Sequence, residues 1–470
     1  MEKKTKIVAT LGPATANEQS IENLLDSGVN VFRLNFSHGI LSDHHRTVEL
    51  IRKIRTRKDQ IVGILGDLPG PKLRIGDIAG GEVFLEDGSD LVIKKGSGEG
   101  TAEGLFINED VVFENLREDD LLFLNDGLIR IRVVSRKNEN LTCKVERGGF
   151  LSSRKGLNIP YLPDRFPALT EQDQAIVETV ITWELDFLAL SFVRSPVDLQ
   201  NLRNLIKNHD PAPALVAKIE KPQALQVLGS IIRESDGVMI ARGDLGVEIP
   251  IEQVPYWQKI IIRECRKQCK PVIVATQMLE SMIHSPIPTR AEVSDVAGAI
   301  YDGADAVMLS GETAIGAFPK ECVMMVSQIA RFIEQQNMFS GDNESWLDGE
   351  TDTSCAVAFG AVEIARKLNL PLIVTCTYSG STARRVSRFR PRQPVLALSP
   401  VRSTLEGLSL CYGVIPKYTP VFDTQEALVE ETTKISLKTG LACKGDNIVI
   451  TAGVPLKKPG LTNLLQVERI

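Results

Sequence analysis

The stretch ALVAKIEKPQALQVLGSIIRESDGVMIARGDLGVEI, residues 214–249, contains two short apolar runs separated by a segment of helical length. The first run, 214–219, is too short for a helix and is soon followed by Pro222, so it predicts a buried strand. A helical crossover over about 223–233 leads to a second predicted strand over 237–241. The stretch therefore predicts two parallel strands joined by a helix.

Charged residues stand at the carboxyl ends of both strands. Side chains alternate along a strand, so Lys218 and Glu220 point to the same side. Adjacent parallel strands lie about 4.8 Å apart, so Glu220 and Asp244, at neighbouring strand ends, could share one divalent cation, with Lys218 beside it. The alternative at this point is a structural ion pair between Lys218 and Glu220, with GDLG as a plain strand-to-helix turn.

Composition narrows the class of protein. The chain has 470 residues, which predicts more than one domain, and its 43% hydrophobic and 24% charged residues are typical of a soluble globular protein. Its net charge of −6 argues against nucleic acid as a partner. No apolar run approaches the roughly 20 residues that span a membrane, and the N-terminus lacks the apolar region of a signal peptide. We therefore expect a cytoplasmic protein with no membrane partner.

The cysteine pattern also agrees with a cytoplasmic protein. The eight cysteines include no C-x-x-C pair, and Cys265 and Cys269 lie one helical turn apart. This pattern favours reduced thiols on or under helices over a disulfide framework or a zinc site.

Strand-length apolar runs recur along the chain and alternate with helical stretches. They begin at residues 6, 30, 61, 187, 214, 237, 271 and 306. Eight parallel strands alternating with helices predict a closed (β/α)8 TIM barrel, in which active sites lie at the carboxyl ends of the strands. The polar residues gather at those ends: Thr10, Arg33, Asn35, Ser37, Asp67, Ser191, Arg194, Lys218, Glu220, Arg242, Asp244, Thr276, Ser310 and Glu312.

Two other regions depart from this rhythm. Residues 70–165 show short alternating runs broken by glycine-rich turns, which predicts a small antiparallel β domain inserted into the barrel as a lid. The barrel then comprises 1–69 and 166–339. After an acidic linker at 340–353, residues 340–470 predict a C-terminal α/β sandwich of the doubly wound kind.

The C-terminal domain carries a candidate phosphate site. The loop TYSGSTAR, 377–384, follows a predicted strand and opens a helix. Hydroxyl groups, free backbone N–H groups and the helix dipole suit a phosphate there, although such a turn is often only a helix start.

At this point the chain resembles the pyruvate kinase family. The resemblance covers nearly the whole length and rests on motifs in the family's order: TKIVATLGPAT, NVFRLNFSHG, LGDLPGPKLR, VAKIEKPQ, IARGDLGVEIP, ATQMLESM, PTRAEVSDVA and VMLSGETA. It implies transfer of a phosphoryl group from phosphoenolpyruvate to ADP, giving pyruvate and ATP.

The resemblance also implies roles for the residues at the strand ends. Glu220 and Asp244 resemble the family's carboxylate ligands for Mg²⁺ or Mn²⁺, which prefer oxygen ligands. Lys218 resembles the catalytic lysine that stabilises charge on the phosphoryl group and the enolate. Backbone N–H groups at Gly243 and Asp244 would hold the substrate carboxylate, and Thr276 would stand near the enolate carbon where pyruvate is protonated.

Further residues resemble those that bind phosphate and nucleotide. Arg33 would face the substrate phosphate, and Lys155 in the lid would reach the nucleotide when the lid closes and excludes water. The remaining nucleotide-side residues are Asn35, Phe36, Ser37, His38 and Arg74.

One motif departs from the pattern of many family members. Those members carry a threonine and a glutamate in the third-strand motif and need K⁺, bound by residues matching Asn35, Ser37 and Asp67. Here Leu68 and Lys72 stand instead. An ammonium group from Lys72 could replace the ion, so we expect an enzyme that does not require K⁺.

The family resemblance adds expectations about regulation and assembly. The last domain resembles an allosteric domain, so a phosphorylated effector is expected at Thr377, Ser379, Gly380, Ser381 and Thr382. A homotetramer is also expected. Two alternatives remain: a metal-dependent, enolate-forming carbon–carbon lyase, which would not need ADP or the lid, and a non-catalytic sensor of phosphorylated metabolites.

Overall fold

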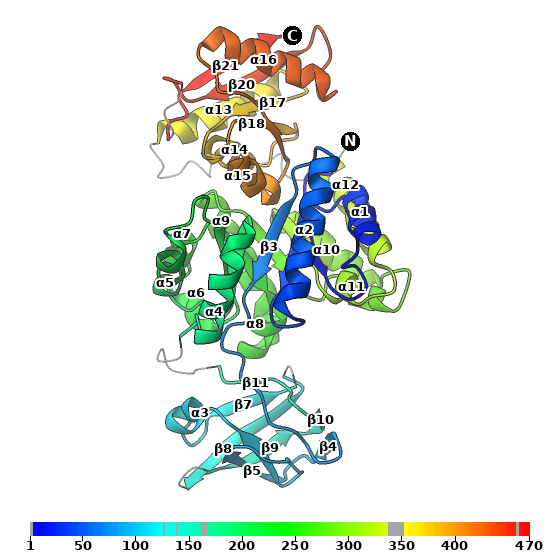
Figure 1. Ribbon diagram of the computed structural model, residues 1–470, viewed down its shortest axis with the longest axis vertical. Helices are drawn as coiled ribbons and strands as arrows, with labels where there is room; N and C mark the ends of the chain where they lie inside the picture. Colours follow the sequence, from blue (N-terminus) through cyan, green and yellow to red (C-terminus); the bar gives the residue numbers. More distant parts are fainter. Residues whose placement is uncertain (1–2, 126, 138–139, 161–166, 337–351, 457–459) are drawn as a thin grey trace.

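The computed structural model describes residues 3–125, 127–137, 140–160, 167–336, 352–456 and 460–470. The chain forms three parts that follow one another along the long axis of the molecule (Figure 1). A barrel occupies the middle, the lid lies at one end, and the C-terminal domain lies at the other. Among the described residues, no helix combines the length and apolar character needed to cross a membrane.

The barrel confirms the predicted (β/α)8 fold. Its strands close in the order β1-β16-β15-β14-β13-β12-β3-β2, and every neighbouring pair is parallel. Its strands are β1 (Lys6–Leu11), β2 (Val31–Asn35), β3 (Gly63–Asp67), β12 (Phe187–Leu190), β13 (Ala214–Ile219), β14 (Gly237–Ala241), β15 (Val272–Ala275) and β16 (Ala306–Leu309). Its helices are α1 (Glu18–Ser27), α2 (Leu41–Arg57), α4 (Glu171–Val180), η1 (Ile181–Trp183), α5 (Pro196–Ile206), α6 (Pro222–Gln226), α7 (Leu228–Glu234), α8 (Arg242–Glu248), η2 (Ile251–Gln253), α9 (Val254–Lys267), η3 (Glu280–Ile283), α10 (Arg290–Asp302), α11 (Gly311–Ala314) and α12 (Pro319–Gln335).

Two apolar layers hold the barrel together and decide which side chains face inward. One cluster fills the interior and includes Val31, Leu65 and Val216, and a larger one lies between the strands and the helices. Because side chains alternate along a strand, the residues two positions after these three, among them Asp67 and Lys218, also face inward. The apolar interior thus forms a floor beneath the polar residues at the carboxyl ends.

Two predicted elements of the barrel were wrong in detail. The single crossover helix expected over about 223–233 is two short helices, α6 and α7, that meet at Val227 with φ −120° and ψ 25°. Ser310 and Glu312 were placed at the carboxyl end of the last strand, but β16 ends at Leu309, and these two residues belong to the N-terminus of the short helix α11. The break at Val227 interrupts a continuous helical pattern, and the polar residues after Leu309 turn into a helix as the chain leaves the barrel.

The lid has its own apolar core and two sheets. Most neighbouring strands are antiparallel, as expected, but β5 and β6 pair in parallel, and the helix α3 was not foreseen. Its elements are β4 (Glu82–Leu85), β5 (Asp90–Lys95), β6 (Gly104–Ile107), α3 (Asp110–Asn115), β7 (Leu121–Leu124), β8 (Ile129–Lys137), β9 (Asn140–Arg147), β10 (Gly149–Ser152) and β11 (Leu157–Asn158).

The C-terminal domain is the predicted α/β sandwich. Its sheet has the order β19-β18-β17-β20-β21, parallel except for the edge strand β21. The acidic linker expected at 340–353 lies almost wholly outside the described residues. The elements are α13 (Thr353–Lys367), β17 (Ile373–Cys376), α14 (Ser381–Ser387), β18 (Val395–Ser399), α15 (Arg402–Gly407), η5 (Leu408–Leu410), β19 (Val414–Tyr418), α16 (Gln425–Lys438), β20 (Asn447–Ala452) and β21 (Leu464–Arg469).

Candidate active site

Four charged side chains meet above the floor of the barrel at the carboxyl ends of β2, β3 and β13. The Lys218 ammonium lies 2.9 Å from Glu220 Oε1 and 3.2 Å from Asp67 Oδ1. On the other side of Asp67, Arg33 Nε donates to Oδ2 at 2.7 Å. Both carboxylate side chains are 1% exposed. The structure therefore brings together Arg33, Asp67, Lys218 and Glu220, whereas the strand spacing had predicted only that Lys218, Glu220 and Asp244 lie near one another.

The charges of this cluster depend on one another. Burial alone would lower the pKa of Lys218, but the carboxylates of Asp67 and Glu220 outweigh it and raise the pKa above its ordinary value. Burial would raise the pKa of Asp67, yet Lys218 and Arg33 hold that pKa below its usual range. Lys218 is therefore a permanent cation at neutral pH, in a place where water does not screen it.

Glu220 behaves differently from Asp67. Burial raises the pKa of Glu220, and the nearby Asp244 carboxylate raises it further against the opposing effect of Lys218. Glu220 Oε2 accepts a hydrogen bond from the backbone N–H of Phe192 at 2.9 Å. Its other oxygen, Oε1, is buried and makes no hydrogen bond with the described residues, because the Lys218 ammonium is close but poorly oriented. A cation beside Glu220 would lower the free energy of its ionised form.

The segment after β12 orients Lys218, a role that sequence reasoning missed. Lys218 Nζ donates to Ser191 Oγ at 2.7 Å, and Ser191 Oγ donates to the carbonyl of Leu68 at 2.7 Å. The next residue, Phe192, has φ of 55°, an unusual value for a bulky residue, while its N–H holds Glu220. Ser191 was noted only as a polar strand-end residue, and nothing in the sequence marks Phe192.

Thr276 and Gly243 meet at the ends of β15 and β14. Thr276 Oγ1 donates to the carbonyl of Ala275 at 2.6 Å and accepts from the N–H of Gly243 at 2.7 Å. The N–H of Gly243 expected to bind a substrate carboxylate is therefore engaged with Thr276 in this structure. Thr276 has φ of 73°, and such strained residues gather at functional sites.

An arginine held by a second carboxylate supports this strained turn. Arg242 Nη2 donates to the carbonyl of Thr276 at 2.8 Å, and its two terminal nitrogens lie 2.6 and 2.7 Å from the Asp295 carboxylate. Such bidentate pairs fix the guanidinium plane. Sequence reasoning placed Arg242 at a strand end but did not identify Asp295, which α10 contributes from 53 residues further along the chain.

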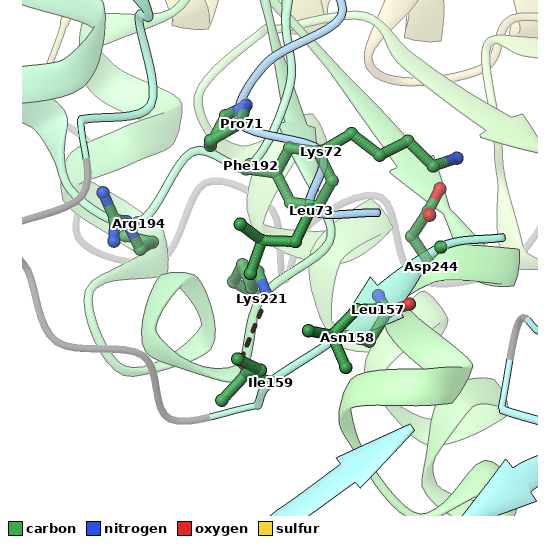
Figure 2. Close-up of a pocket in the computed structure, with 11 residues that line it drawn as sticks. Pro71, Lys72, Leu73, Leu157, Asn158, Ile159, Phe192, Arg194, Lys221 and Asp244 are labelled. Atoms are coloured by element: carbon green, nitrogen blue, oxygen red, sulfur yellow. Dashed lines mark hydrogen bonds between the residues drawn. The ribbon is translucent and has the colours of Figure 1, made fainter. Parts of the chain in front are cut away.

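A pocket opens between this cluster and the base of the lid (Figure 2). Asp244 and Arg194 line it from the barrel, Lys72 from the outgoing lid connection, and Asn158 and Ile159 from the returning one. Figure 2 shows the extended side chain of Lys72 directed to the same side of the pocket as the Asp244 carboxylate. The pocket thus places Asp244, one of the two metal candidates, beside both connections to the lid.

The expected nucleotide residues lie around the tip of β2. Asn35 Oδ1 accepts from the Ser37 N–H at 3.2 Å, and Phe36 is buried. Burial lowers the pKa of His38, and the charges of Arg74, Lys72 and Arg33 lower it further. This site is therefore cationic, as a polyphosphate requires.

The lid residues of the nucleotide side are held through backbone contacts. Arg74 Nη1 donates to the carbonyl of Arg154 at 3.0 Å, and the carbonyl of Lys155 accepts from the Ile75 N–H at 3.1 Å. These contacts place Lys155 beside the same connection that carries Lys72 and Arg74.

The three residues expected to resemble a potassium site do not form an open cage. Asp67 is held by Arg33 and Lys218, and Asn35 caps the Ser37 N–H. Lys72 is exposed, and no ion pair joins it to Asp67 in the part of the chain that the structure describes.

The site suits a divalent cation that takes few protein ligands. Within the described ranges, no group of three or more His, Cys, Asp or Glu side chains could hold a metal ion. The residues that fit are Glu220, with its unbonded buried oxygen, and Asp244, which lines the adjoining pocket. Two carboxylates with open positions for substrate oxygens are what Mg²⁺ commonly uses in phosphoryl-transfer sites.

A second pocket lies over the candidate phosphate loop of the C-terminal domain. Ser379 and Ser381 line it, and their hydroxyls lie 3.2 Å apart. The other hydroxyls face internal partners, since Thr377 Oγ1 accepts from Gly380 N at 2.9 Å and Thr382 Oγ1 lies 2.7 Å from Thr462 Oγ1. The five predicted residues therefore form one loop, in which the two serines are best placed to meet a ligand.

Comparisons with known proteins agree along the whole chain. Residues 2–323 match the family model "Pyruvate kinase, barrel domain", and residues 355–468 match "Pyruvate kinase, alpha/beta domain". Pyruvate kinases of Staphylococcus aureus strains USA300 and COL are 39% identical over 473 residues, covering 100% of this chain and 80% of theirs. The crystal structure of a pyruvate kinase from Cryptosporidium parvum matches with a TM-score of 0.92 at 34% identity, covering 99% of this chain and 96% of that one.

Proposed function

Because the chain belongs to the pyruvate kinase family and is a phosphotransferase of that kind, we propose roles for its residues in moving a phosphoryl group from phosphoenolpyruvate to ADP. The observation that carries these roles is the Lys218 ammonium, held between Asp67 and Glu220 above the barrel floor. Family membership replaces the lyase and the metabolite sensor as descriptions of the chain.

Lys218 and Arg33 act on the phosphoryl group. Both are fixed by Asp67, so their positive charges need no rearrangement as negative charge develops on the transferred group and on the enolate oxygen. In phosphoryl transfer, positioning and electrostatic stabilisation supply most of the rate enhancement. Ser191 and the Phe192 N–H are positioning groups that hold Lys218 and Glu220.

Glu220 and Asp244 would hold Mg²⁺ or Mn²⁺, which when bound neutralises charge on the substrate oxygens. Thr276 lies where the enolate carbon is protonated, and its hydroxyl is fixed by Ala275 and Gly243. The Gly243 and Asp244 N–H groups bind the substrate carboxylate, which requires the Gly243 N–H to exchange its bond with Thr276 for one with the substrate.

The nucleotide lies between β2 and the lid. Asn35, Phe36, Ser37 and His38 form its barrel side, and Arg74 and Lys155 approach from the lid. The cationic surroundings of His38 support this placement. Closure of the lid over the pocket of Figure 2 would exclude water and prevent hydrolysis of the phosphoryl group.

The test measures pyruvate formed from phosphoenolpyruvate and Mg²⁺, with and without ADP, in tetramethylammonium buffer and then with K⁺ at equal ionic strength. We expect ADP-dependent pyruvate formation in both buffers, because Lys72 supplies the cation that K⁺ supplies elsewhere. Activity that requires K⁺ would retain the kinase and reject the role of Lys72. Pyruvate formation without ADP would contradict the assigned reaction.

The serine loop of the C-terminal domain binds a phosphorylated metabolite. The two serine hydroxyls that line the pocket, and Arg384 Nη1 donating to the carbonyl of Ser379 at 3.0 Å, support an anion site. Ser379→Asp should weaken equilibrium binding of sugar phosphates and AMP by tenfold or more, because it adds a negative charge. Unchanged binding would exclude this loop, and Ser230→Asp, at an exposed position in α7 of the barrel, controls for added charge.

The family also suggests a cytoplasmic homotetramer. Light scattering of the purified chain tests the assembly directly, and a monomer or dimer at micromolar concentration would reject it.

A further inference from the structure

Two cysteines from different parts of the chain meet where the barrel contacts the C-terminal domain. Cys269 follows α9 and precedes β15, and Cys355 lies in the first turn of α13. The two thiols are hydrogen-bonded to each other. Figure 1 shows α9 at the end of the barrel nearest to α14 and α13. This end is opposite to the lid and the active site.

The guanidinium of Arg388 lies beside this thiol pair. Arg388 Nη1 lies 3.5 Å from Cys269 Sγ and also donates to the carbonyl of Lys267 at 3.2 Å. Its own carbonyl accepts two hydrogen bonds from Arg266, at 3.2 and 3.0 Å. The Arg388 guanidinium is therefore buried and fixed beside the Cys269 sulfur.

These neighbours favour the thiolate form of Cys269. The hydrogen bond from Cys355 and the charges of Arg388 and Arg385 outweigh burial and lower the pKa of Cys269 to about 6. An ordinary cysteine has a pKa of about 8.5. Cys269 is half-buried and can meet a reagent from solution, whereas Cys355 is buried and can react only with a neighbouring group of the protein.

The backbone of Cys269 has the left-handed conformation that commonly ends a helix. Its φ is 54°, in the left-handed region that glycine adopts without strain at the end of a helix. Glycine would adopt this conformation with less strain, so Cys269→Gly is a substitution that the backbone accepts.

We propose that Cys269 and Cys355 form a redox-sensitive dithiol that hydroperoxides convert to a disulfide linking the barrel to the C-terminal domain. The Cys269 thiolate attacks the terminal oxygen of hydrogen peroxide, the O–O bond breaks, and the departing hydroxide takes a proton to become water. The Cys355 sulfur then attacks the resulting sulfenic acid, forming the S–S bond. The sulfenic oxygen leaves as a second water with the Cys355 proton. Two thiols and one peroxide thus give one disulfide and two waters.

The position of the pair predicts which properties change on oxidation. The bond would fasten the start of α13 to the amino end of the barrel, while Lys218, Glu220 and Thr276 lie at the carboxyl ends of the strands. We therefore expect oxidised protein to keep its basal rate of pyruvate formation and to unfold at a higher temperature.

The experiment treats the full-length protein with hydrogen peroxide at pH 7, blocks the remaining thiols and analyses the peptides by mass spectrometry. The expected product is a Cys269–Cys355 linkage within one chain that dithiothreitol reverses. Cys355→Ser should instead leave a sulfenic acid at Cys269 that dimedone traps. Cys443, which is exposed, is the control for accessibility. Oxidation of Cys443 before Cys269, or linkage of Cys269 to any other cysteine, would overturn the proposal.

A second measurement is independent of disulfide formation. The rate of Cys269 alkylation by iodoacetamide should rise with pH to a midpoint near 6, and Arg388→Met should move that midpoint upward by one unit or more. Circular dichroism confirms that the variant is folded. Cys269→Gly, which suits the left-handed backbone, should abolish the linkage while preserving the fold. An alkylation midpoint near 8.5 in the unmodified protein would contradict the assignment.

Discussion

Lys218 has the most convergent set of contacts in the active site, and its replacement gives the sharpest test of the mechanism. Lys218→Met removes the cation that faces the phosphoryl group, while Asp67 keeps its bond with Arg33. Loss of a preorganised charge of this kind commonly costs about 10²- to 10³-fold in rate. We expect kcat for pyruvate formation to fall by about 10³-fold or more, because the same cation also meets the enolate.

The control for Lys218→Met is metal binding. Glu220 and Asp244 remain in the variant, so a Mn²⁺ titration followed by electron paramagnetic resonance should show binding within a few-fold of the unmodified protein. Turnover that persists at the original rate would remove Lys218 from the mechanism.

Lys72 can be tested through its charge. Lys72→Glu restores the residue type of potassium-requiring members, so the variant should lose about tenfold or more of its rate in tetramethylammonium buffer and regain most of it with K⁺. Arg136→Glu, at an exposed position of β8 in the lid, controls for the change of charge. Equal rates of Lys72→Glu in the two buffers would show that Lys72 does not replace the ion.

The sequence predicted the inward side chains better than their partners. Lys218, Glu220 and Asp67 could be found because alternation along a strand fixes direction, and consecutive barrel strands are neighbours. Asp295 and Phe192 could not be found, because their roles depend on contacts made after folding: an ion pair with Arg242, and an N–H turned toward Glu220. The same limit applies to Gly243, whose N–H was expected to be free.

At the scale of elements, the predicted helices and strands were correct where the apolar pattern repeated along the chain, and they were wrong in short segments. The strand-helix alternation was long enough to give all eight barrel strands. In contrast, the split of the crossover at Val227 and the parallel pairing of β5 with β6 depend on tertiary contacts that no local period reveals.

One ion pair connects the elements of the active site to the lid. Lys221 Nζ lies 2.7 Å from Glu248 Oε1, which also accepts from Asn158 Nδ2 at 3.2 Å, and Lys221 reaches the carbonyl of Ile159 at 3.5 Å (Figure 2). Lys221 directly follows Glu220, and Glu248 lies one helical turn after Asp244. This pair therefore ties the returning lid connection to the segments that carry both metal candidates.

Breaking this pair should weaken the lid and its nucleotide site together. Lys221→Met leaves the fully buried Glu248 carboxylate uncompensated, a change that typically costs about 3–5 kcal/mol. We expect a lower melting temperature and a higher KM for ADP, measured by calorimetry and steady-state kinetics. Adding Glu248→Gln should recover much of the stability. Arg154→Met, which breaks the exposed pair with Asp77, is the matched control and should change little.

At the scale of the whole molecule, buried charges join the barrel to the C-terminal domain. Arg390 Nη2 lies 2.9 Å from Asp305 Oδ2, and Arg55 lies 3.1 Å from both Asp186 and Glu406. Glu406 belongs to α15, so Arg55 links the barrel to the last domain. None of these pairs could be predicted from sequence, because each joins residues that only the packing of two domains brings together.

The Arg55 cluster makes the stability of this contact depend on pH. Burial raises the pKa of Asp186 to about 8. The positive charge of Arg55 opposes this rise. The Glu406 carboxylate adds to it, both by its negative charge and by accepting a hydrogen bond from protonated Asp186. An unfolded aspartate has a pKa of about 3.9. Between these values the folded protein holds a proton that the unfolded chain has lost. The stabilisation is therefore complete below about pH 4, decreases as the pH rises through this window, and is gone above about 8.

Asp186→Asn tests this dependence, because the amide mimics the protonated acid and can donate to Glu406. The unfolding temperature of the unmodified protein should fall relative to the variant as the pH rises from 5 to 8.5, with an upper limit of about 1.4 kcal/mol per pH unit. Asp236→Asn is the matched control, since Asp236 also accepts from a strand N–H and an arginine but is more exposed. If the difference in unfolding temperature between Asp186→Asn and the unmodified protein does not change with pH, Asp186 is ionised at neutral pH. Arg55 would then hold the two domains together through two charged carboxylates.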